Sequence, residues 1–467
     1  MAERRILARI SSAIADVTRD GGTMPASMTA NVTPETEMRR LTPDVVVVGA
    51  GPAGCVLSYM LARSGVETLL LERNATLDRE FRGFGFQPYV ARAFDQLGLL
   101  DDVLDLPHER VQKAYASVYG RRYELLDFTD VSPRENFLLL MDQPALLELL
   151  VERAGEFEKF SFRSATAVTD VREEDGRVVG VDARDREANA ELEIESRLVV
   201  GADGRYSTVR EAAGIDAGLF DSELEIVWFK LEDAAIDVTT QLRVGEAGVL
   251  VYAPLSDSVA QCGWPIPKGS YGDLRARGIE AFRRQLVSVD PDLEGTVETQ
   301  LTEFGDCSLL RVEPGLCDQW VDDGLLLLGD AAHVASPFGG QGNSLAVQDA
   351  VVAHGTIVAA LSKTYRSDGV LPVDRLRRFE QRRYPAVERV VRMQRRIERL
   401  VTGLLLYGYR VPEPIRIPAL RAAFGALSTV GTSSLGRRQR RLLAFGPDPP
   451  RVDSTLFVSD EQSMTTS

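Results

Sequence analysis

The chain has 467 residues, which is enough for two or three compact domains or one large discontinuous pair. A hydrophobic fraction of 44% and a charged fraction of 26% are typical of a folded protein, and the net charge of −15 argues against nucleic acid as a partner. The four cysteines include no C-x-x-C pair and histidines number only three, so we predict no metal site and a reducing, cytoplasmic location.

The first 42 residues predict a flexible N-terminal extension. Residues 3–18 carry apolar side chains at helical spacing, which also fits an amphipathic targeting or membrane-surface segment. Residues 19–42 are rich in Gly, Thr, Ser and Pro, which favours the flexible interpretation. No apolar run in the chain has the length that a bilayer-spanning helix requires.

A β–turn–α–β unit follows the extension. Four consecutive valines at 45–48 predict a buried parallel strand, residues 53–64 predict a helix, and residues 67–71 predict a second strand that Glu72 closes. Between the first strand and the helix stands a G-x-G-x-x-G pattern formed by Gly49, Gly51 and Gly54.

This glycine pattern has a mechanical meaning. Gly49 permits a tight turn, Gly51 lets the backbone approach a pyrophosphate, and Gly54 lets the helix pack closely on the strand. Free N–H groups at the helix N-terminus attract phosphates, and Glu72 stands where an acidic residue binds the ribose hydroxyls. We therefore predict a dinucleotide site, with a glycine-rich turn of another α/β fold as the alternative.

The rest of the chain predicts an α/β domain with a β-rich insertion. Short buried strands are predicted at 138–141, 198–201 and 325–328, and β-structure at 165–197 and 225–265. The last third is helical in pattern. The predicted parts are a flexible extension (1–42), a nucleotide-binding domain (43–120, 142–224 and 305–373), a substrate domain (121–141 and 225–304), a C-terminal helical region (374–445) and a flexible tail (446–467).

Two later segments resemble the signatures of one enzyme family. Residues 201–210 (GADGRYSTVR) resemble the DG motif of flavoprotein hydroxylases, and residues 329–333 (GDAAH), with Pro337 and residues 340–343 (GQGN), resemble their GD motif. Together with the glycine pattern, these are the three signatures of class A, single-component FAD-dependent monooxygenases, such as p-hydroxybenzoate hydroxylase and the ubiquinone-biosynthesis hydroxylases. The resemblance covers about residues 43–400.

The resemblance implies a fold and a cofactor. The fold would be α/β, with a Rossmann-like FAD-binding domain of the glutathione-reductase type, interrupted by a β-rich substrate domain and followed by C-terminal helices. Asp330 would bind the ribityl chain of FAD, and Asp203 with Gly204 would lie near the pyrophosphate and contribute to NAD(P)H binding. A plain helix N-cap and an Asx turn are the structural alternatives for these aspartates.

Further FAD contacts are implied with alternatives of their own. Arg82 would lie near the phosphates of FAD and NAD(P)H or be a solvated surface arginine, and Gln143 would contact FAD or cap a helix. Arg210 is interpreted as fixing the DG turn rather than contacting a ligand. The remaining predicted cofactor contacts are Ala53, Arg73, Val168, Gly342 and Asn343.

The loop after Asp330 is the predicted catalytic part. Pro337, Gly339 and Gly340 would lie beside the isoalloxazine ring, and no acid or base residue is assigned. The helix that follows would direct N–H groups at the flavin edge that becomes anionic on reduction. His333 is interpreted as structural. The resemblance implies NAD(P)H as a transient co-substrate, and the lack of a visible second strand–glycine–helix unit agrees with it.

The insertion would form the sheet over the flavin and supply an apolar substrate pocket. Its candidate aromatic residues, each individually more typical of a core position, are Trp228, Phe229, Tyr252, Trp264 and Phe282. Residues 262–269 contain W-x-I-P, part of a tryptophan-halogenase motif, but Cys262 replaces the first Trp. This stretch looks more like that of hydroxylase-type and prenyl-reductase-type relatives.

Residues 375–410 form a basic amphipathic stretch in an acidic protein. One interpretation is a helix that makes peripheral contact with an anionic membrane. The favoured interpretation is a helix packed on the FAD domain with a solvated basic face.

The resemblance implies a monooxygenase. NAD(P)H would reduce the flavin, and O2 would put one oxygen atom into an aromatic or polyketide-like small molecule through a flavin C4a-hydroperoxide. A flavin-dependent isoprenoid reductase of the geranylgeranyl type is the alternative, followed by a flavin-dependent halogenase. The expected state is a monomer or homodimer.

Overall fold

The computed structural model describes residues 39–78, 85–232, 240–256, 258–363, 369–403, 411–433 and 436–458. Arg82 and the amphipathic stretch predicted within residues 3–18 lie outside the described residues. All described residues belong to one unit, which begins at Met38.

The sheet that carries the nucleotide motifs has six strands, in the order β20-β21-β13-β2-β3-β9. These strands are Val321–Asp322 (β20), Leu325–Leu327 (β21), Leu198–Gly201 (β13), Val45–Val48 (β2), Thr68–Leu71 (β3) and Phe160–Arg163 (β9). All neighbours are parallel except β20 and β21. Every residue of β2, β3, β13 and β21 is buried, which explains their unbroken apolar sequences.

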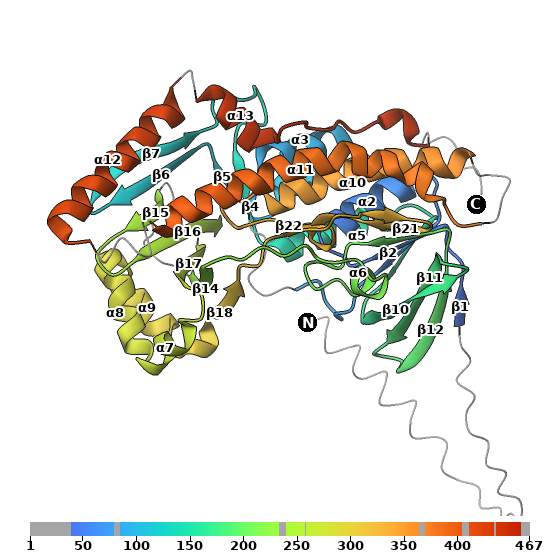
Figure 1. Cartoon of the computed structure of the whole chain (residues 1–467), viewed down its shortest axis with the longest axis horizontal. Coiled ribbons are helices and arrows are strands. Elements are labelled where there is room, and N and C mark those ends of the chain that lie inside the picture. Colours follow the sequence, from blue (N-terminus) through green and yellow to red (C-terminus); the bar gives the residue numbers. More distant parts are fainter. Residues whose placement is uncertain are drawn as a thin grey trace, which may run out of the picture. The chain divides into compact units, whose positions relative to one another are not determined.

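Helices cover this sheet and complete the Rossmann-like domain that the sequence predicted. Helix α2 (Pro52–Arg63) packs on β2 and β3 and contacts both α5 (Gln143–Gly155) and α10 (Gly342–Lys363). Helix α11 (Val373–Val401) runs beside α10 (Figure 1). By length and composition α10 could cross a bilayer, but 83% of its apolar window is buried within the fold, as in a core helix.

Besides the two-stranded sheet of β19 (Gly315–Leu316) and β22 (His333–Val334), two smaller sheets flank this domain. One has the order β1-β12-β11-β10, with β1 at Arg39–Leu41, β12 at Ala190–Glu195, β11 at Arg177–Asp185 and β10 at Thr166–Glu174. The other has the order β4-β8-β5, with β4 at Gly85–Phe86, β8 at Leu138–Leu140 and β5 at Glu109–Val111. Because β1 pairs in parallel with β12, the predicted extension to residue 42 is too long by at least these three residues.

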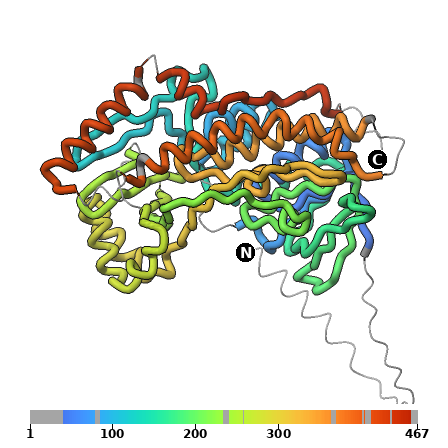
Figure 2. The backbone as a smooth tube through the Cα atoms, viewed as in Figure 1, coloured from blue at the N-terminus to red at the C-terminus, as the bar shows by residue number. Residues whose placement is uncertain are grey.

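A seven-stranded sheet forms the other large layer, in the order β18-β14-β17-β16-β15-β6-β7. Its strands are Ser308–Arg311 (β18), Leu224–Glu232 (β14), Val259–Pro267 (β17), Val249–Ser256 (β16), Thr240–Val244 (β15), Lys113–Val118 (β6) and Arg121–Asp127 (β7). Figure 2 shows the segment with β6 and β7 returning to the later strands. Strands β6 and β18 thus extend this sheet beyond the ranges predicted for the substrate domain.

Short helices accompany these layers. On the seven-stranded sheet, a core cluster joins its strands to α7 (Tyr271–Ala276), α8 (Ile279–Val289) and α9 (Glu294–Gln300). Helix α12 (Glu413–Thr432) lies along β7 (Figure 1). The remaining α-helices in the described residues are α3 (Pro88–Leu97), α4 (Leu100–Asp105), α6 (Thr208–Ala212) and α13 (Arg437–Phe445).

The basic stretch of α11 packs on the FAD domain, as the favoured interpretation predicted. Leu376, Phe379 and Val387 are fully buried in the main core, while Arg377 and Arg378 are exposed. Because the apolar face of the helix is already covered, most of its arginines form an outer, solvated face, whereas Arg383 is buried.

The C-terminal segment 446–458 corrects the predicted flexible tail. Tyr89 donates a hydrogen bond to the carbonyl oxygen of Pro450 (3.2 Å), and the Val458 N–H donates to the carbonyl oxygen of Arg63 (3.1 Å). The Arg63 guanidinium lies over the face of the Phe457 ring, 4.4 Å from the ring centroid. The polar, Pro-rich composition of this segment predicts a loose chain. A few side-chain and backbone contacts nevertheless fix the segment to the FAD domain.

A pH dependence of stability follows from His354, a residue of α10 that lies 5.5 Å from the Phe457 ring. Burial lowers the pKa of His354 to about 4. As pH falls below 6.5, the unfolded chain takes up this proton before the folded chain does, so stability is complete above that pH and is lost on the way to pH 4. We expect this residue to account for about 3 kcal/mol of that loss.

Chemical denaturation at pH 7 and pH 5 of the native chain and His354→Gln tests this expectation. The glutamine can still bond to the Ser64 hydroxyl, which contacts the His354 ring at 2.8 Å. The variant should lose less stability between the two pH values. Equal losses in both chains would contradict the assignment.

Candidate active site

The predicted motifs meet at one edge of the six-stranded sheet. Gly49 follows β2, Glu72 follows β3, Asp203 follows β13 and Asp330 follows β21. These four strands are consecutive neighbours and mutually parallel, so their carboxyl ends lie side by side. In open α/β sheets this edge is where nucleotides bind.

The glycine turn has no room for side chains. Gly49 has φ +102°, and a Cβ there would lie 2.5 Å from the carbonyl oxygen of Ala202. A Cβ on Gly54 would lie 2.0 Å from the carbonyl oxygen of Gly49. Gly51 is the N-cap of α2, and the first turn of this helix has neither a side-chain cap nor an acidic residue. Its N–H groups and positive dipole end are therefore suited to a phosphate.

Glu72 fixes the end of β3 to this turn. Its carboxylate accepts hydrogen bonds from the backbone N–H groups of Ala50 (3.1 Å) and Asn74 (3.0 Å), and the side chain is buried. The neighbouring Arg73 is exposed. Val168 is half-buried in β10, and the start of this strand bonds to Glu72, because the Thr166 N–H donates to the Glu72 carbonyl oxygen (2.8 Å).

The DG turn packs directly against the glycine turn through the Ala202 carbonyl group. The Asp203 carboxylate accepts hydrogen bonds from the Ser207 hydroxyl (2.5 Å) and the Val209 N–H (3.2 Å), so it caps α6. Burial raises the pKa of this carboxyl despite these bonds. Gly204 has φ +87°, as a turn glycine requires. In this structure the Asp203 side chain therefore bonds to the start of α6, and its contact with a cofactor stays a prediction.

Arg210 fixes the DG turn, as interpreted from the sequence. Its buried guanidinium donates to the carbonyl oxygens of Arg205 (3.0 Å) and Ala331 (3.1 Å). The second bond reaches the GD motif. Arg210 thus holds the DG and GD turns together.

The GD turn rests on a buried polar network. Asp349 in α10 accepts hydrogen bonds from the Gly329 N–H (3.0 Å) and the Arg383 Nε (2.7 Å), and it contacts the His333 Nε2 at 2.6 Å. Burial would raise the pKa of the Asp349 carboxyl, but His333 and Arg383 hold it below its usual value. His333 has the structural role expected of it. Asp330 itself is half-buried at the start of the turn.

Side chains from two other segments hold the loop with Pro337, Gly339 and Gly340. Gln87 donates to the Gly339 carbonyl oxygen (2.8 Å), and Gln394 donates to the carbonyl oxygens of Ser336 (2.9 Å) and Phe338 (2.8 Å). Gly339 and Gly340 both have positive φ, at +80° and +57°. These glycines give the loop a backbone shape that other residues rarely adopt.

Further buried contacts complete the loop's support. The Glu398 carboxylate accepts hydrogen bonds from the hydroxyls of Ser222 (2.5 Å) and Ser336 (2.7 Å). Gln341 donates to the Leu443 carbonyl oxygen in α13 (2.8 Å). Sequence reasoning missed Gln87, Gln394 and Glu398, because nothing local marks a glutamine or glutamate that bonds to a distant loop.

The two remaining polar candidates stand at helix starts near this edge. Gln143 is buried at the first residue of α5, and Gly342 begins α10. Asn343 donates to the Gly85 carbonyl oxygen (3.1 Å), which ties the start of α10 to β4. The cofactor contacts implied for Gln143, Gly342 and Asn343 stay predictions.

The aromatic residues predicted to line the substrate pocket fall into two separate core clusters. Phe229, Tyr252, Trp264 and Phe282 belong to the core cluster beneath α7–α9, so the core interpretation applies to them. Trp228 belongs to a separate cluster, against which Phe338 of the loop Pro337–Gly340 packs. A Cβ on Gly263 would lie 2.6 Å from the Trp228 ring, so this glycine makes space for the indole.

Gln394 provides a prediction for this loop. Gln394→Leu removes two hydrogen bonds worth about 1 kcal/mol each, so the loop should lose its fixed position while the glycine turn stays intact. If the chain is the FAD-dependent hydroxylase that the resemblance implies, we expect normal FAD content but a severalfold lower yield of hydroxylated product per NAD(P)H oxidised. Arg396→Leu, on the exposed side of α11, is the matched control. An unchanged yield in Gln394→Leu would contradict this role.

The residues at the edge fit FAD. A cradle without Cβ atoms and an uncapped helix start suit the pyrophosphate, and the carboxylates of Glu72 and Asp330 suit hydroxyl groups. Among the described residues, the amide oxygens of Gln87, Gln341 and Gln394 are buried without a partner, so the loop region also offers hydrogen-bond acceptors to a ligand.

Comparisons with known proteins agree with this geometry. The FAD binding domain family matches residues 42–394. The 6-methylpretetramide 4-monooxygenase of Streptomyces rimosus is 36% identical over 421 residues, which cover 90% of this chain and 96% of that protein. A probable NADH-specific resorcinol 4-hydroxylase of Rhodococcus jostii is 31% identical over 319 residues, which cover 66% of this chain and 57% of that protein.

The fold agrees as well. The crystal structure of the p-nitrophenol 4-monooxygenase of Pseudomonas putida superposes with a TM-score of 0.68 at 20% identity, over 88% of this chain and all of that chain. The family match covers most of the chain and includes all three motifs, and the cofactor cradle is intact. The chain therefore belongs to the class A, single-component FAD-dependent monooxygenases, and it is an FAD-dependent oxidoreductase.

Proposed function

We propose that this chain hydroxylates an aromatic, polyketide-like small molecule with O2 and NAD(P)H, in the cytoplasm, as a monomer or homodimer. The observation that carries the proposal is the match to 6-methylpretetramide 4-monooxygenase over nearly the full length of both chains. The relative named as an NADH-specific hydroxylase supports a nicotinamide co-substrate. Peripheral membrane contact through α11 stays a prediction.

The proposed division of labour follows the structure. Gly49, Gly51 and the start of α2 would hold the pyrophosphate, with Glu72 at the ribose and Asp330 at the ribityl chain. Bound FAD supplies the redox chemistry that accepts hydride and activates O2. No acid or base residue is assigned a chemical step.

The loop Pro337–Gly340 and β14 would then enclose the reacting centre. The loop is held by Gln87 and Gln394, so its backbone N–H and C=O groups keep fixed positions. Trp228 and Phe338 contribute an apolar boundary that keeps water away from an aromatic ring. Specificity would come from the residues of β14 on the same face as Trp228.

The test is product analysis under isotope-labelled O2. The purified protein, loaded with FAD, is incubated with NADH or NADPH and a panel of polycyclic phenols related to pretetramide. We expect substrate-stimulated oxygen uptake and a product heavier by one labelled oxygen atom. Reduction of a prenyl lipid without oxygen uptake would overturn the proposal in favour of an isoprenoid reductase, and a halogenated product in favour of a halogenase.

A further inference from the structure

An arginine-lined pocket lies apart from the cofactor cradle. It has a volume of about 470 Å³, and its lining includes Arg92, Arg437, Arg438, Arg441, Leu442 and Pro449. Arg92 comes from α3 and the other three arginines from α13. No acidic residue is among the described residues that line it. In a chain of net charge −15, four arginines around one pocket form a local positive field.

Carboxylates outside the pocket neutralise only part of its positive charge. Asp130 pairs with Arg437 (3.1 Å), but it is shared with Arg440 (2.6 Å), which does not line the pocket. Arg92 pairs with Glu135 at 3.4 Å. Five arginines thus share two carboxylates, so the pocket keeps an excess of positive charge.

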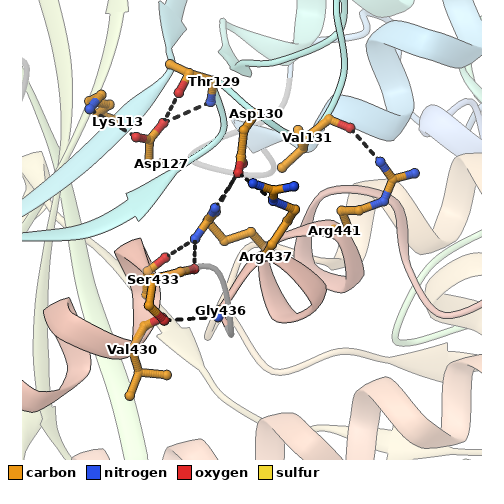
Figure 3. A network of polar contacts seen from close by, with 12 residues as sticks. Lys113, Asp127, Thr129, Asp130, Val131, Val430, Ser433, Gly436, Arg437 and Arg441 are labelled. Atoms are coloured by element: carbon orange, nitrogen blue, oxygen red, sulfur yellow. Dashed lines mark hydrogen bonds and ion pairs between the residues drawn. The ribbon is translucent and has the colours of Figure 1, made fainter.

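The arginines are also held in place. Arg441 donates to the neutral carbonyl oxygen of Val131 (3.0 Å), which orients its guanidinium without removing its charge (Figure 3). Asp130 receives Arg437 in the same view. The Arg92 guanidinium lies 3.8 Å from the Phe445 ring centroid. Preorganised guanidinium groups with free N–H donors are the groups that proteins use to bind phosphates.

The pocket is connected to the active site through α13. The Leu443 carbonyl oxygen accepts the hydrogen bond from Gln341, and a Cβ on Gly339 would lie 3.4 Å from the Leu443 side chain. The pocket and the loop with Gly339 therefore contact the same helix, whose diameter is about 10 Å. A ligand whose phosphates lie in the pocket and whose other end meets this loop would therefore have to pass around one helix of that diameter.

For NAD(P)H, a co-substrate of the proposed reaction that carries phosphates, the resemblance implies contacts only at the DG turn (Asp203 and Gly204) and at Arg82. Among the described residues, the parallel sheet offers one glycine cradle, and FAD takes it. We propose that the pocket lined by Arg92, Arg437, Arg438 and Arg441 binds the phosphate groups of NAD(P)H while the nicotinamide reaches toward the loop Pro337–Gly340. The identity of the ligand rests on the proposed function, whereas the phosphate chemistry rests on the pocket alone.

The test uses the FAD-loaded full chain and the variant Arg438→Gln/Arg441→Gln. Arg377→Gln/Arg378→Gln on α11 removes the same charge outside the pocket and is the matched control. Anaerobic stopped-flow reduction by NADPH and by NADH gives the dissociation constant and the limiting rate separately. We expect the dissociation constant to rise about tenfold in the pocket variant, with the limiting rate and the thermal unfolding temperature close to those of the control.

Calorimetric titration with 2′,5′-ADP, which has phosphates but no nicotinamide, separates the pocket from the reaction. It should bind the native chain and the control and lose about tenfold affinity in the pocket variant. If neither nucleotide reduces the flavin, the proposed function fails, yet this titration still decides whether the pocket binds phosphates. Unchanged affinity for 2′,5′-ADP, or loss of that affinity with an unchanged NAD(P)H dissociation constant, would overturn the inference.

Discussion

Gly54→Ala should purify with little or no bound FAD. The added Cβ would lie 2.0 Å from the Gly49 carbonyl oxygen, so α2 or the glycine turn must shift. Overpacking of this kind costs about 1–3 kcal/mol. Displacement of the turn by that energy would weaken FAD binding by about tenfold to a hundredfold.

The measurement is the FAD dissociation constant of the apoprotein, followed by flavin fluorescence. Gly155→Ala is the matched control, because a Cβ there meets no atom within 4 Å and the residue lies in the last turn of α5. Native affinity in Gly54→Ala would show that the turn does not hold the cofactor.

Asp349→Ala should lower the free energy of unfolding by about 3–5 kcal/mol. The substitution leaves the Arg383 guanidinium, whose side chain is 1% exposed, without its carboxylate, and it leaves the Gly329 N–H without an acceptor. Because Gly329 precedes Asp330, the GD turn should lose its fixed shape along with stability.

Urea denaturation of the native chain, Asp349→Ala and Asp349→Leu/Arg383→Met measures this effect. In the double variant no buried charge is left unpaired, so we expect it to regain about half of the lost stability. FAD affinity should stay reduced in both variants, since neither supplies an acceptor for the Gly329 N–H. A single variant as stable as the native chain would contradict the assigned role of Asp349.

The cofactor edge could be predicted from the sequence because its signals are local. A glycine pattern follows a valine run, and single aspartates follow two later apolar runs. These patterns identify strand ends without knowledge of which strands pair. The parallel order β21-β13-β2-β3 then places Asp330, Asp203, Gly49 and Glu72 together. Arg210 supports the DG turn as expected, since its guanidinium bonds to two backbone carbonyl oxygens, and His333 contacts Asp349, which agrees with the structural role that the resemblance implies.

The rest depended on contacts between distant segments. Strand β6 pairs with β15, and β18 with β14, so local alternation could not reveal their membership of the seven-stranded sheet. Gln87, which precedes α3, and Gln394 of α11 bond to the same loop. The segment 446–458 has the composition of a tail, but Tyr89 and Arg63 fix it in place.

The most direct test of the central claim is a comparison of FAD and FMN binding to the apoprotein. The glycine turn, the start of α2 and Glu72 are proposed to hold the pyrophosphate and ribose of a dinucleotide, which FMN lacks. We predict one FAD per chain and far weaker binding of FMN. A protein that binds neither flavin, or that binds FMN as tightly as FAD, would contradict the assignment of this edge.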